Sequence, residues 1–308
     1  MLLFIVIFII FVSKKLTHMN QSEKNDAITV SALAREMRKR LESRYGQGEA
    51  KAMTSLIFHH LKGWNATDMI INADRPVSDY VLEKTRDILA RLDSGEPLQY
   101  ILGEARFYGM DLKVSPAVLI PRQETEELVD LIVRENKGDD LRVLDIGTGS
   151  GAIAIALSRN LPFSKVTAID ISAAALAVAR ENASALHARI ELLEQDVFTY
   201  APAPGSFDII VSNPPYIARS ESKDMDSNVL DHEPHMALFV PDDDPLLYYS
   251  RIAEIGRSAL AGHGRLYFEI NPRFADILAT MLRTEGYADV RIIDDISHRR
   301  RFAAAIKP

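Results

Sequence analysis

Apolar residues follow two different spacings along the chain. Between residues 27 and 94 they recur at steps of three and four, which places them on one face of a helix. The two runs are Val30, Leu33, Met37 and Leu41, then Met53, Leu56, Ile57 and Leu61. We expect them to form the core of a small helical bundle, with a further helix over residues 77–92 and Ser78 near its start. Basic residues at 35–40 are interpreted as a solvated face, with a partner contact as the alternative.

From residue 125 onward, strand and helix patterns alternate, which is typical of a parallel sheet covered by helices on both faces. The expected strands are 141–145, 165–170, 189–194, 207–212, 264–270, 290–294 and 301–306. Residues 104–114 alternate as a β-hairpin turning at Tyr108 and Gly109. We therefore predict an α/β fold with a Rossmann-like seven-stranded sheet, a helical domain at 19–96, a linker and hairpin at 97–118, and the α/β domain at 119–308.

Residues 1–18 form an apolar N-terminal extension. Its unbroken apolar run from Met1 to Val12 is shorter than the roughly 20 residues that cross a bilayer as a helix. It also lacks the preceding positive charge and the cleavage site of a secretory signal. Two interpretations stay open: translation begins at Met19, or the extension is a membrane anchor, with membrane contact only if residues 1–12 are translated. Either way, we expect a cytoplasmic catalytic body.

A glycine-rich turn follows the first strand of the expected sheet. Gly147, Gly149 and Gly151 precede a helix-like segment, so backbone N–H groups can approach a ligand at a helix N-terminus. A dinucleotide site would place its third glycine one position later and would bind a pyrophosphate. Here Asp145 precedes the turn, and a carboxylate suits a ligand that carries an ammonium group and no phosphate. S-adenosylmethionine fits that description.

Polar side chains also end the next three strands. Asp170 stands where α/β nucleotide folds bind ribose hydroxyls, and Asp196 can accept from an adenine amino group beside Val197 and Phe198. A single Asp of this kind is ordinarily a helix cap or a loop residue, but four polar strand ends in order favour a nucleoside site. The candidate cofactor-binding residues are Asp145, Gly147, Thr148, Gly149, Ser150, Gly151, Asp170, Asp196, Val197 and Asn213.

The fourth strand runs into Asn213, Pro214, Pro215 and Tyr216. The nitrogen of an amide or exocyclic amine is a poor nucleophile, because its lone pair is delocalised. A catalyst must therefore hold it in line with a methyl donor. The Asn213 side-chain oxygen and the Pro214 carbonyl can each accept one N–H, the prolines restrict the backbone, and Tyr216 can cover the substrate. Alone, this tetrapeptide is an ordinary turn; after the glycine turn it predicts methyl transfer to a planar nitrogen.

From about residue 30 to its end, the chain resembles the HemK/PrmC family of protein-(glutamine-N5) methyltransferases. Besides the tetrapeptide, the matching segments are residues 97–103, 107–109 and 118–126, Glu233-Pro234, Ala237-Leu238, Phe268-Glu269-Ile270, and Asp295 with Arg301. Departures are Gln123, where the family usually has proline, and Asn271 and Phe274, where glycine and glutamine are expected. The resemblance implies a class I S-adenosylmethionine-dependent methyltransferase whose helical domain grips a protein substrate.

The substrate implied by the resemblance is the glutamine of a Gly-Gly-Gln tripeptide in class 1 peptide chain release factors. Asn213, Pro214, Pro215 and Tyr216 are the expected catalytic residues. With them, Phe107 and Arg122 are expected to hold the substrate glutamine, although Phe107 equally fits a packing role in the hairpin. The alternatives are a ribosomal-protein glutamine, N6-adenine of a nucleic acid, and a binding module without catalysis.

Composition narrows these options. The chain has no cysteine, which excludes disulfides and thiolate catalysis. Its eight histidines are scattered, so we expect no metal. A formal net charge of −7 argues against a large basic surface for duplex nucleic acid. We expect a monomer.

Overall fold

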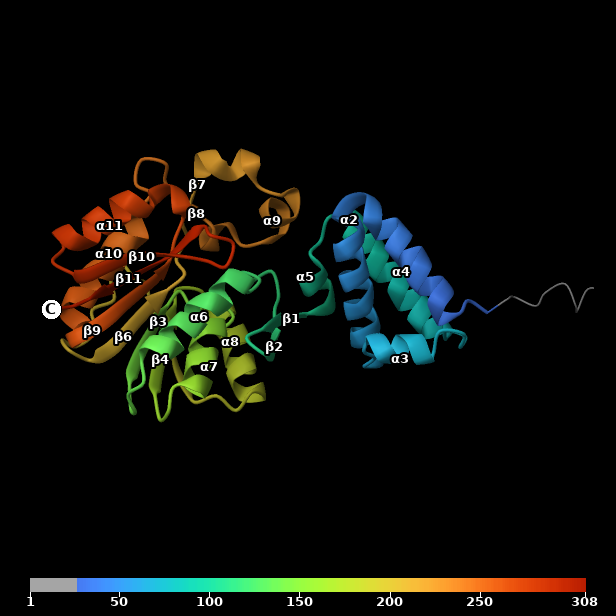
Figure 1. Cartoon of the computed structure of the whole chain (residues 1–308), viewed down its shortest axis with the longest axis horizontal. Coiled ribbons are helices and arrows are strands. Elements are labelled where there is room, and N and C mark those ends of the chain that lie inside the picture. Colours follow the sequence, from blue (N-terminus) through green and yellow to red (C-terminus); the bar gives the residue numbers. More distant parts are fainter. Residues whose placement is uncertain (1–26) are drawn as a thin grey trace, which may run out of the picture. The chain divides into compact units, whose positions relative to one another are not determined.

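The structure, a computed structural model, describes residues 27–308 and divides into two compact units, with the boundary between Ser94 and Gly95 (Figure 1). The expectations about the apolar extension, the start at Met19 and the membrane anchor lie outside the described residues. Within residues 27–308, no helix combines the length and the hydropathy that crossing a bilayer requires.

The first unit is helical. Its helices are α2 (Val30–Lys62), α3 (Ala66–Ile71) and α4 (Asp79–Asp93). Each begins at a polar cap: Thr29, Asn65 and Ser78 accept hydrogen bonds from backbone N–H groups of the first turn. The placement of Ser78 at the start of a helix is therefore confirmed.

Most residues of the two apolar stripes of α2 are buried in the core of this unit, but Leu61 is half-buried and Leu56 is exposed. Leu56 is 47% exposed, so its assignment to the core was wrong. The helix is interrupted at Gly46, where φ is 76°, and its second half buries Ala50, Met53 and Ile57. Leu56 lies outside that face, because the helical repeat of 3.6 residues turns it towards solvent.

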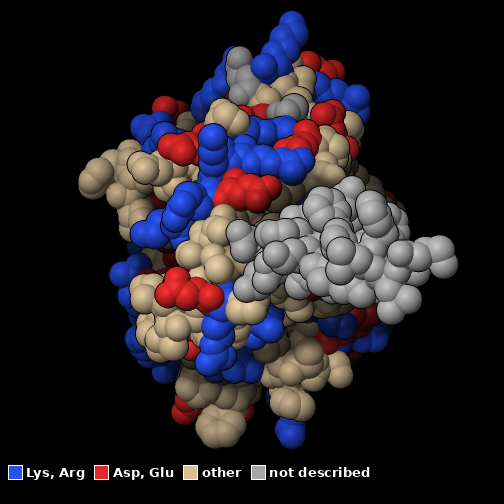
Figure 2. Space-filling view, turned by 90° about the vertical axis from the view of Figure 1, so that its right-hand side faces the viewer, with Lys and Arg blue, Asp and Glu red and all other residues tan. Residues whose placement is uncertain are grey.

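The basic residues of α2 are exposed, as a solvated face requires. Arg35, Arg38 and Lys39 are all accessible, and Arg40 pairs with Asp93 of α4. On the face of the molecule shown in Figure 2, basic and acidic side chains are interspersed.

The second unit contains the predicted seven-stranded sheet. Its strands are β3 (Arg142–Ile146), β4 (Lys165–Asp170), β5 (Ile190–Glu194), β6 (Phe207–Ser212), β9 (Leu260–Glu269), β10 (Ala288–Asp294) and β11 (Arg300–Ile306). They lie in the order β10-β11-β9-β6-β3-β4-β5, and β11 is antiparallel to both of its neighbours. The other pairs are parallel. The prediction of a mostly parallel seven-stranded sheet is confirmed.

Helices cover both faces of this sheet, as Figure 1 shows. On one face are α6 (Gln123–Glu135), α7 (Ala152–Asn160) and α8 (Ala173–Ala185); on the other are α10 (Leu247–Ala259) and α11 (Ala275–Thr284). Successive strand residues alternate between the two cores: Val143 packs with α6 and α7, whereas Leu144 packs with α10 and α11. The inner strands are buried on both sides, which explains their apolar runs, whereas the edge strands β5 and β10 contain no fully buried residue.

A hairpin precedes the sheet in the sequence. Helix α5 (Leu98–Leu102) leads into β1 (Glu104–Phe107) and β2 (Met110–Lys113), and the turn places Tyr108 and Gly109 at φ values of 45° and 75°. Two positive φ values in a two-residue loop match the twist of paired strands. The predicted hairpin is confirmed.

Short elements lie between β6 and β9, and a further turn follows β9. They are β7 (Ile217–Ala218), η1 (Arg219–Asp224), α9 (Ser227–His232), η2 (His235–Ala237), β8 (Phe239–Val240) and, after β9, η3 (Pro272–Phe274).

Candidate active site

A cavity of about 420 Å³ lies within the second unit at the carboxyl ends of the central strands. It is lined by the turn after β3, the last residue of β4, the segment after β5 and the first three residues of the tetrapeptide after β6. These strands are neighbours in the sheet, so their ends meet although they are far apart in sequence. Open α/β sheets bind ligands at this edge.

The glycine turn forms the floor of the cavity. Gly147, Thr148, Gly149 and Ser150 line it, and both Gly147 and Gly149 have positive φ values. The N–H groups of Gly147 and Thr148 donate to Ile169 O at 2.9 and 3.0 Å, which fixes the turn against β4. Positive φ is accessible to glycine at little cost, so the backbone itself can face a ligand.

Two predicted cofactor residues do not line the cavity. Asp145 is fully buried behind the turn, where its Oδ2 accepts a hydrogen bond from Thr148 Oγ1 at 2.7 Å. Burial raises the pKa of Asp145 to about 7. Gly151 lies at the start of α7, where an added Cβ would be 3.2 Å from the Cβ of Ala179. Gly151 therefore permits close packing of α7 against α8, and Asp145 organises the turn from within.

Two carboxylates face the cavity with defined orientations. Asp170 accepts the N–H of Gly149 through Oδ2 and the N–H of Ser172 through Oδ1, both at 2.9 Å. Asp196 accepts the N–H of Phe198 through Oδ1 at 2.9 Å. Each carboxylate oxygen keeps a lone pair for a ligand hydroxyl or amino group.

Apolar side chains surround Asp196. Val197, Phe198 and Tyr248 line the same part of the cavity, and the rings of Phe198 and Tyr248 are 5.4 Å apart. Sequence reasoning missed Tyr248, because it comes from α10 more than 50 residues after Asp196. A flat aromatic base would fit between acceptor groups and apolar walls of this kind.

Among the described residues that line the cavity, Arg122 supplies the only lysine or arginine side chain. Arg122 pairs with the buried carboxylate of Glu233, whose Oε2 also accepts the N–H of Ile120 at 3.2 Å. A paired cation is poorly placed to bind a pyrophosphate. The cavity offers hydrogen-bond acceptors, the backbone of a glycine turn and apolar walls, which suit a nucleoside that carries a positively charged group. The residues present therefore fit S-adenosylmethionine. Within residues 27–308, no cluster of three histidine or acidic side chains could hold a metal ion.

The tetrapeptide divides between the cavity and the protein interior. Asn213, Pro214 and Pro215 line the cavity, whereas Tyr216 does not. The Tyr216 hydroxyl donates to Glu269 Oε1 at 3.2 Å, and Asn271, at a position where the family usually has glycine, donates from Nδ2 to the Tyr216 carbonyl at 3.1 Å. Tyr216 therefore anchors the tetrapeptide from behind.

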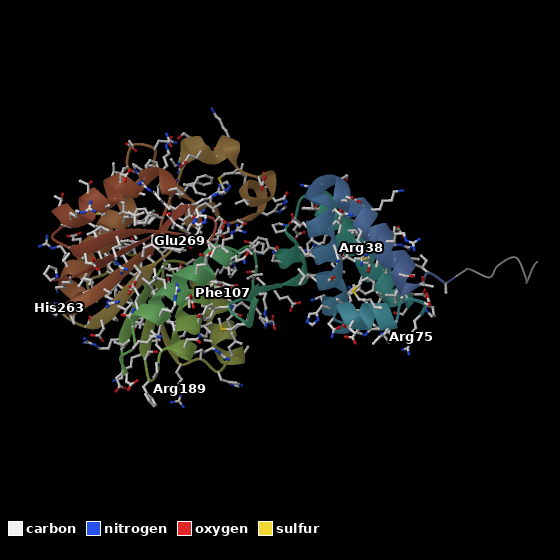
Figure 3. All side chains as sticks on the ribbon, in the orientation of Figure 1. Arg38, Arg75, Phe107, Arg189, His263 and Glu269 are labelled. Atoms are coloured by element: carbon white, nitrogen blue, oxygen red, sulfur yellow. The ribbon has the colours of Figure 1, made fainter. Side chains whose placement is uncertain are left out.

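Phe107 also lies away from the cavity. Its side chain is fully buried in the core beside α6 and α7, and Figure 3 labels it in the hairpin. This placement favours packing over substrate contact. The hairpin still reaches the site indirectly: Asn182 of α8 donates from Nδ2 to Lys113 O at 3.0 Å and to Ser150 O at 2.9 Å.

Two residues behind Asn213, Thr125 and Glu269, were not among the site residues predicted from the sequence. Asn213 Nδ2 donates to Thr125 Oγ1 at 3.3 Å, and Thr125 Oγ1 donates to Glu269 Oε2 at 2.6 Å. Glu269 ends β9 and is buried (Figure 3). A carboxylate at the end of an otherwise apolar strand was the signal in the sequence.

Fold and site together define the class of protein. With its sheet strands numbered in chain order, the second unit has the order 3-2-1-4-5-7-6, a cavity at the strand ends lined by Asp170 and Asp196, and Asn-Pro-Pro-Tyr after the fourth strand. It is a class I S-adenosylmethionine-dependent methyltransferase.

Comparison with known proteins identifies the family. Residues 124–234 match the methyltransferase small domain, and residues 32–103 match the PrmC N-terminal domain. A release factor glutamine methyltransferase of Bacteroides thetaiotaomicron is 48% identical over 270 residues, covering 87% of this chain and 97% of the relative. Proteins with the same name from Streptococcus pneumoniae and Flavobacterium psychrophilum are 46% and 42% identical, covering 77% and 78% of this chain and 84% of each relative. The chain belongs to the release factor glutamine methyltransferase family, as its motifs predicted.

Proposed function

We propose that this protein transfers a methyl group from S-adenosylmethionine to the side-chain amide N5 of the glutamine in the Gly-Gly-Gln tripeptide of class 1 release factors. The observation that carries the proposal is the orientation of the Asn213 side-chain amide. Its side chain lines the cavity, and the hydrogen bond it makes to the described residues is donated by Nδ2. Its oxygen is therefore available to a substrate NH2 group.

The tetrapeptide would orient the acceptor nitrogen. Asn213 Oδ1 and the Pro214 carbonyl each accept one N–H of the substrate amide, which leaves the face of the nitrogen turned to the donor. Positive charge develops on that nitrogen as the new N–C bond forms, and the two oxygens stabilise it. The nitrogen then loses one proton to water, so a strong base is not required. S-adenosylmethionine, when bound, supplies a methyl group made electrophilic by its sulfonium.

The remaining cavity residues would hold the cofactor and the substrate. We assign the ribose hydroxyls to Asp170, the adenine to Asp196 and Val197, and the methionine part to the backbone of the glycine turn. Arg122, held by Glu233, remains our candidate for the wall that receives the substrate glutamine. We assign recognition of the release factor to the helical unit.

The test is methyl transfer from labelled S-adenosylmethionine by the full-length chain. Separate reactions contain a class 1 release factor, the same factor with its Gly-Gly-Gln glutamine changed to glutamate, a ribosomal protein and DNA. We expect label in the unmodified release factor alone. Asn213→Ala should lower kcat about 100- to 1,000-fold. Asn160→Ala is the control, because that side chain bonds to Ala156 O at the end of α7 and does not line the cavity.

Each contrary outcome has a distinct meaning. Label that persists in the glutamate variant of the release factor refutes the assigned acceptor. Label in the ribosomal protein or in DNA replaces the substrate while keeping the reaction. The absence of transfer to every acceptor favours a binding module.

A further inference from the structure

Three hydrogen bonds connect Asn213 to the protein interior. Asn213 Nδ2 lies 3.3 Å from Thr125 Oγ1, which lies 2.6 Å from Glu269 Oε2, and the Tyr216 hydroxyl lies 3.2 Å from Glu269 Oε1. Thr125 comes from the first turn of α6, and Glu269 comes from the end of β9. We call these four residues the Asn213 network. Of them, Thr125 and Asn213 line the cavity.

The chemistry of the groups determines the direction of each hydrogen bond. An ionised carboxylate only accepts, so both oxygens of Glu269 require donors. Thr125 has one hydroxyl proton, and its short contact with Glu269 uses it. The Thr125 oxygen can then only accept from Asn213, so the Asn213 NH2 must face Thr125. The Asn213 oxygen is consequently directed to the remaining side, which is the cavity.

We propose that Glu269 is a positioning residue that acts through Thr125 to hold the Asn213 amide in its productive orientation. This inference rests on the proposed function, since the orientation matters only if Asn213 Oδ1 receives a substrate N–H. If the amide were reversed, its NH2 would face the NH2 of the substrate glutamine. Two donors would then oppose each other, and the acceptor nitrogen would lose one of its two anchors.

The surroundings of Glu269 supply two hydrogen-bond donors, one to each carboxylate oxygen. Burial and the nearby Glu124 raise the pKa of Glu269, and the hydrogen bonds from Thr125 and Tyr216 and the positive charge of Arg301 offset part of that increase. Arg301 comes from β11 and is itself paired with Asp295 at 3.2 Å. Glu269 thus has two donors and a nearby cation, which is the environment that an acceptor-only group requires.

Replacement of Glu269 by glutamine tests this logic with little change in shape. A glutamine has one acceptor oxygen and one NH2, so it cannot accept from both Thr125 and Tyr216. When its NH2 faces Thr125, the threonine proton turns towards Asn213 and favours the reversed amide. Thr125→Val removes the connecting hydroxyl, whereas Thr125→Ser retains it.

The experiment compares kcat, KM for the release factor and the dissociation constant of S-adenosylmethionine among these variants. We expect Glu269→Gln and Thr125→Val each to lower kcat about 10- to 100-fold, with KM and cofactor affinity changed less than about threefold. Thr125→Ser should recover most of the rate. The double variant should be no slower than the slower single variant, because both changes break one connection.

Glu135→Gln is the matched control. Glu135 joins the same two elements at another point, since it ends α6 and accepts from Tyr267, two residues before Glu269 in β9, at 2.9 Å; neither residue lines the cavity. We expect it to lower stability without lowering kcat. A Thr125→Val variant with wild-type kcat, or a double variant whose losses multiply, would overturn the proposal.

A second measurement separates this inference from the proposed function. The side-chain amide of Asn213 can be assigned by NMR through its loss in Asn213→Ala. In the wild type we expect one slowly exchanging N–H, and in Thr125→Val exchange at least about fivefold faster. Unchanged exchange refutes the Asn213 network even if release factor is methylated. Accelerated exchange in Thr125→Val, without methylation of release factor by the wild type, supports the Asn213 network and refutes release factor as the substrate.

Discussion

Replacement of Asp145 by asparagine should change how stability depends on pH. Asp145 is fully buried, and burial raises its pKa from 3.8 to about 7. The folded state therefore holds this proton more tightly than the unfolded state does. A group of this kind contributes most stability at low pH, and that contribution is lost as pH rises through the folded pKa. Asparagine is neutral throughout and lacks this dependence.

The size of the effect follows from the two pKa values. One pKa unit corresponds to about 1.4 kcal/mol. With a pKa of about 7 in the folded state and 3.8 in the unfolded state, ionisation of Asp145 lowers the free energy of unfolding of the wild type, relative to its value at low pH. The loss is roughly 2 kcal/mol at pH 5.5 and roughly 4 kcal/mol at pH 8.5. The variant should gain about 2 kcal/mol relative to the wild type between these two pH values. Any constant difference in hydrogen bonding cancels.

The assay is urea unfolding of both proteins at the two pH values, followed by far-UV circular dichroism. Trp64, the only tryptophan of the chain, lies in the helical unit, so its fluorescence follows that unit separately. The relative gain should appear in the transition of the second unit. If the difference between the proteins is the same at pH 5.5 and pH 8.5, the raised pKa of Asp145 is refuted.

Two further predictions concern stability. Gly151→Ala should destabilise the second unit by about 1–3 kcal/mol, because φ is 82° and the new Cβ would be 3.2 Å from that of Ala179. Gly286→Ala shares the positive φ without a neighbour within 4 Å, so calorimetry should give it the smaller loss; equal losses contradict the packing argument. Arg142 lowers the pKa of Asp208 in the folded state through side-chain hydrogen bonds of 2.7 and 3.0 Å. The stability that this pair contributes is therefore present above the pKa of Asp208 in the unfolded state, and it is lost as pH falls through the lower pKa of the folded state. Asp208→Asn should therefore cost about 1–2 kcal/mol at pH 7 and less at pH 3.5 in urea unfolding, whereas a loss that grows at low pH refutes it.

The sequence alone determined the strands of the sheet and the polar residues that end them at the cavity. Strands buried on both faces appear as short apolar runs, and a polar residue that ends such a run lies at the edge of the sheet where ligands bind. For that reason Asp170, Asp196 and Asn213 could be selected before their surroundings were known. The glycine turn was equally visible, because positive φ favours glycine and leaves a direct mark on the sequence.

The tertiary structure alone decided what lies behind the cavity wall. Thr125 is 144 positions from Glu269 and 88 positions from Asn213, and no local pattern links residues so far apart. Their contact depends on the strand order, which places β9 beside β6, and on the helix that covers them. The same packing buries Phe107 and turns the Tyr216 hydroxyl to Glu269, because a side chain's direction depends on which neighbours fill the space around it.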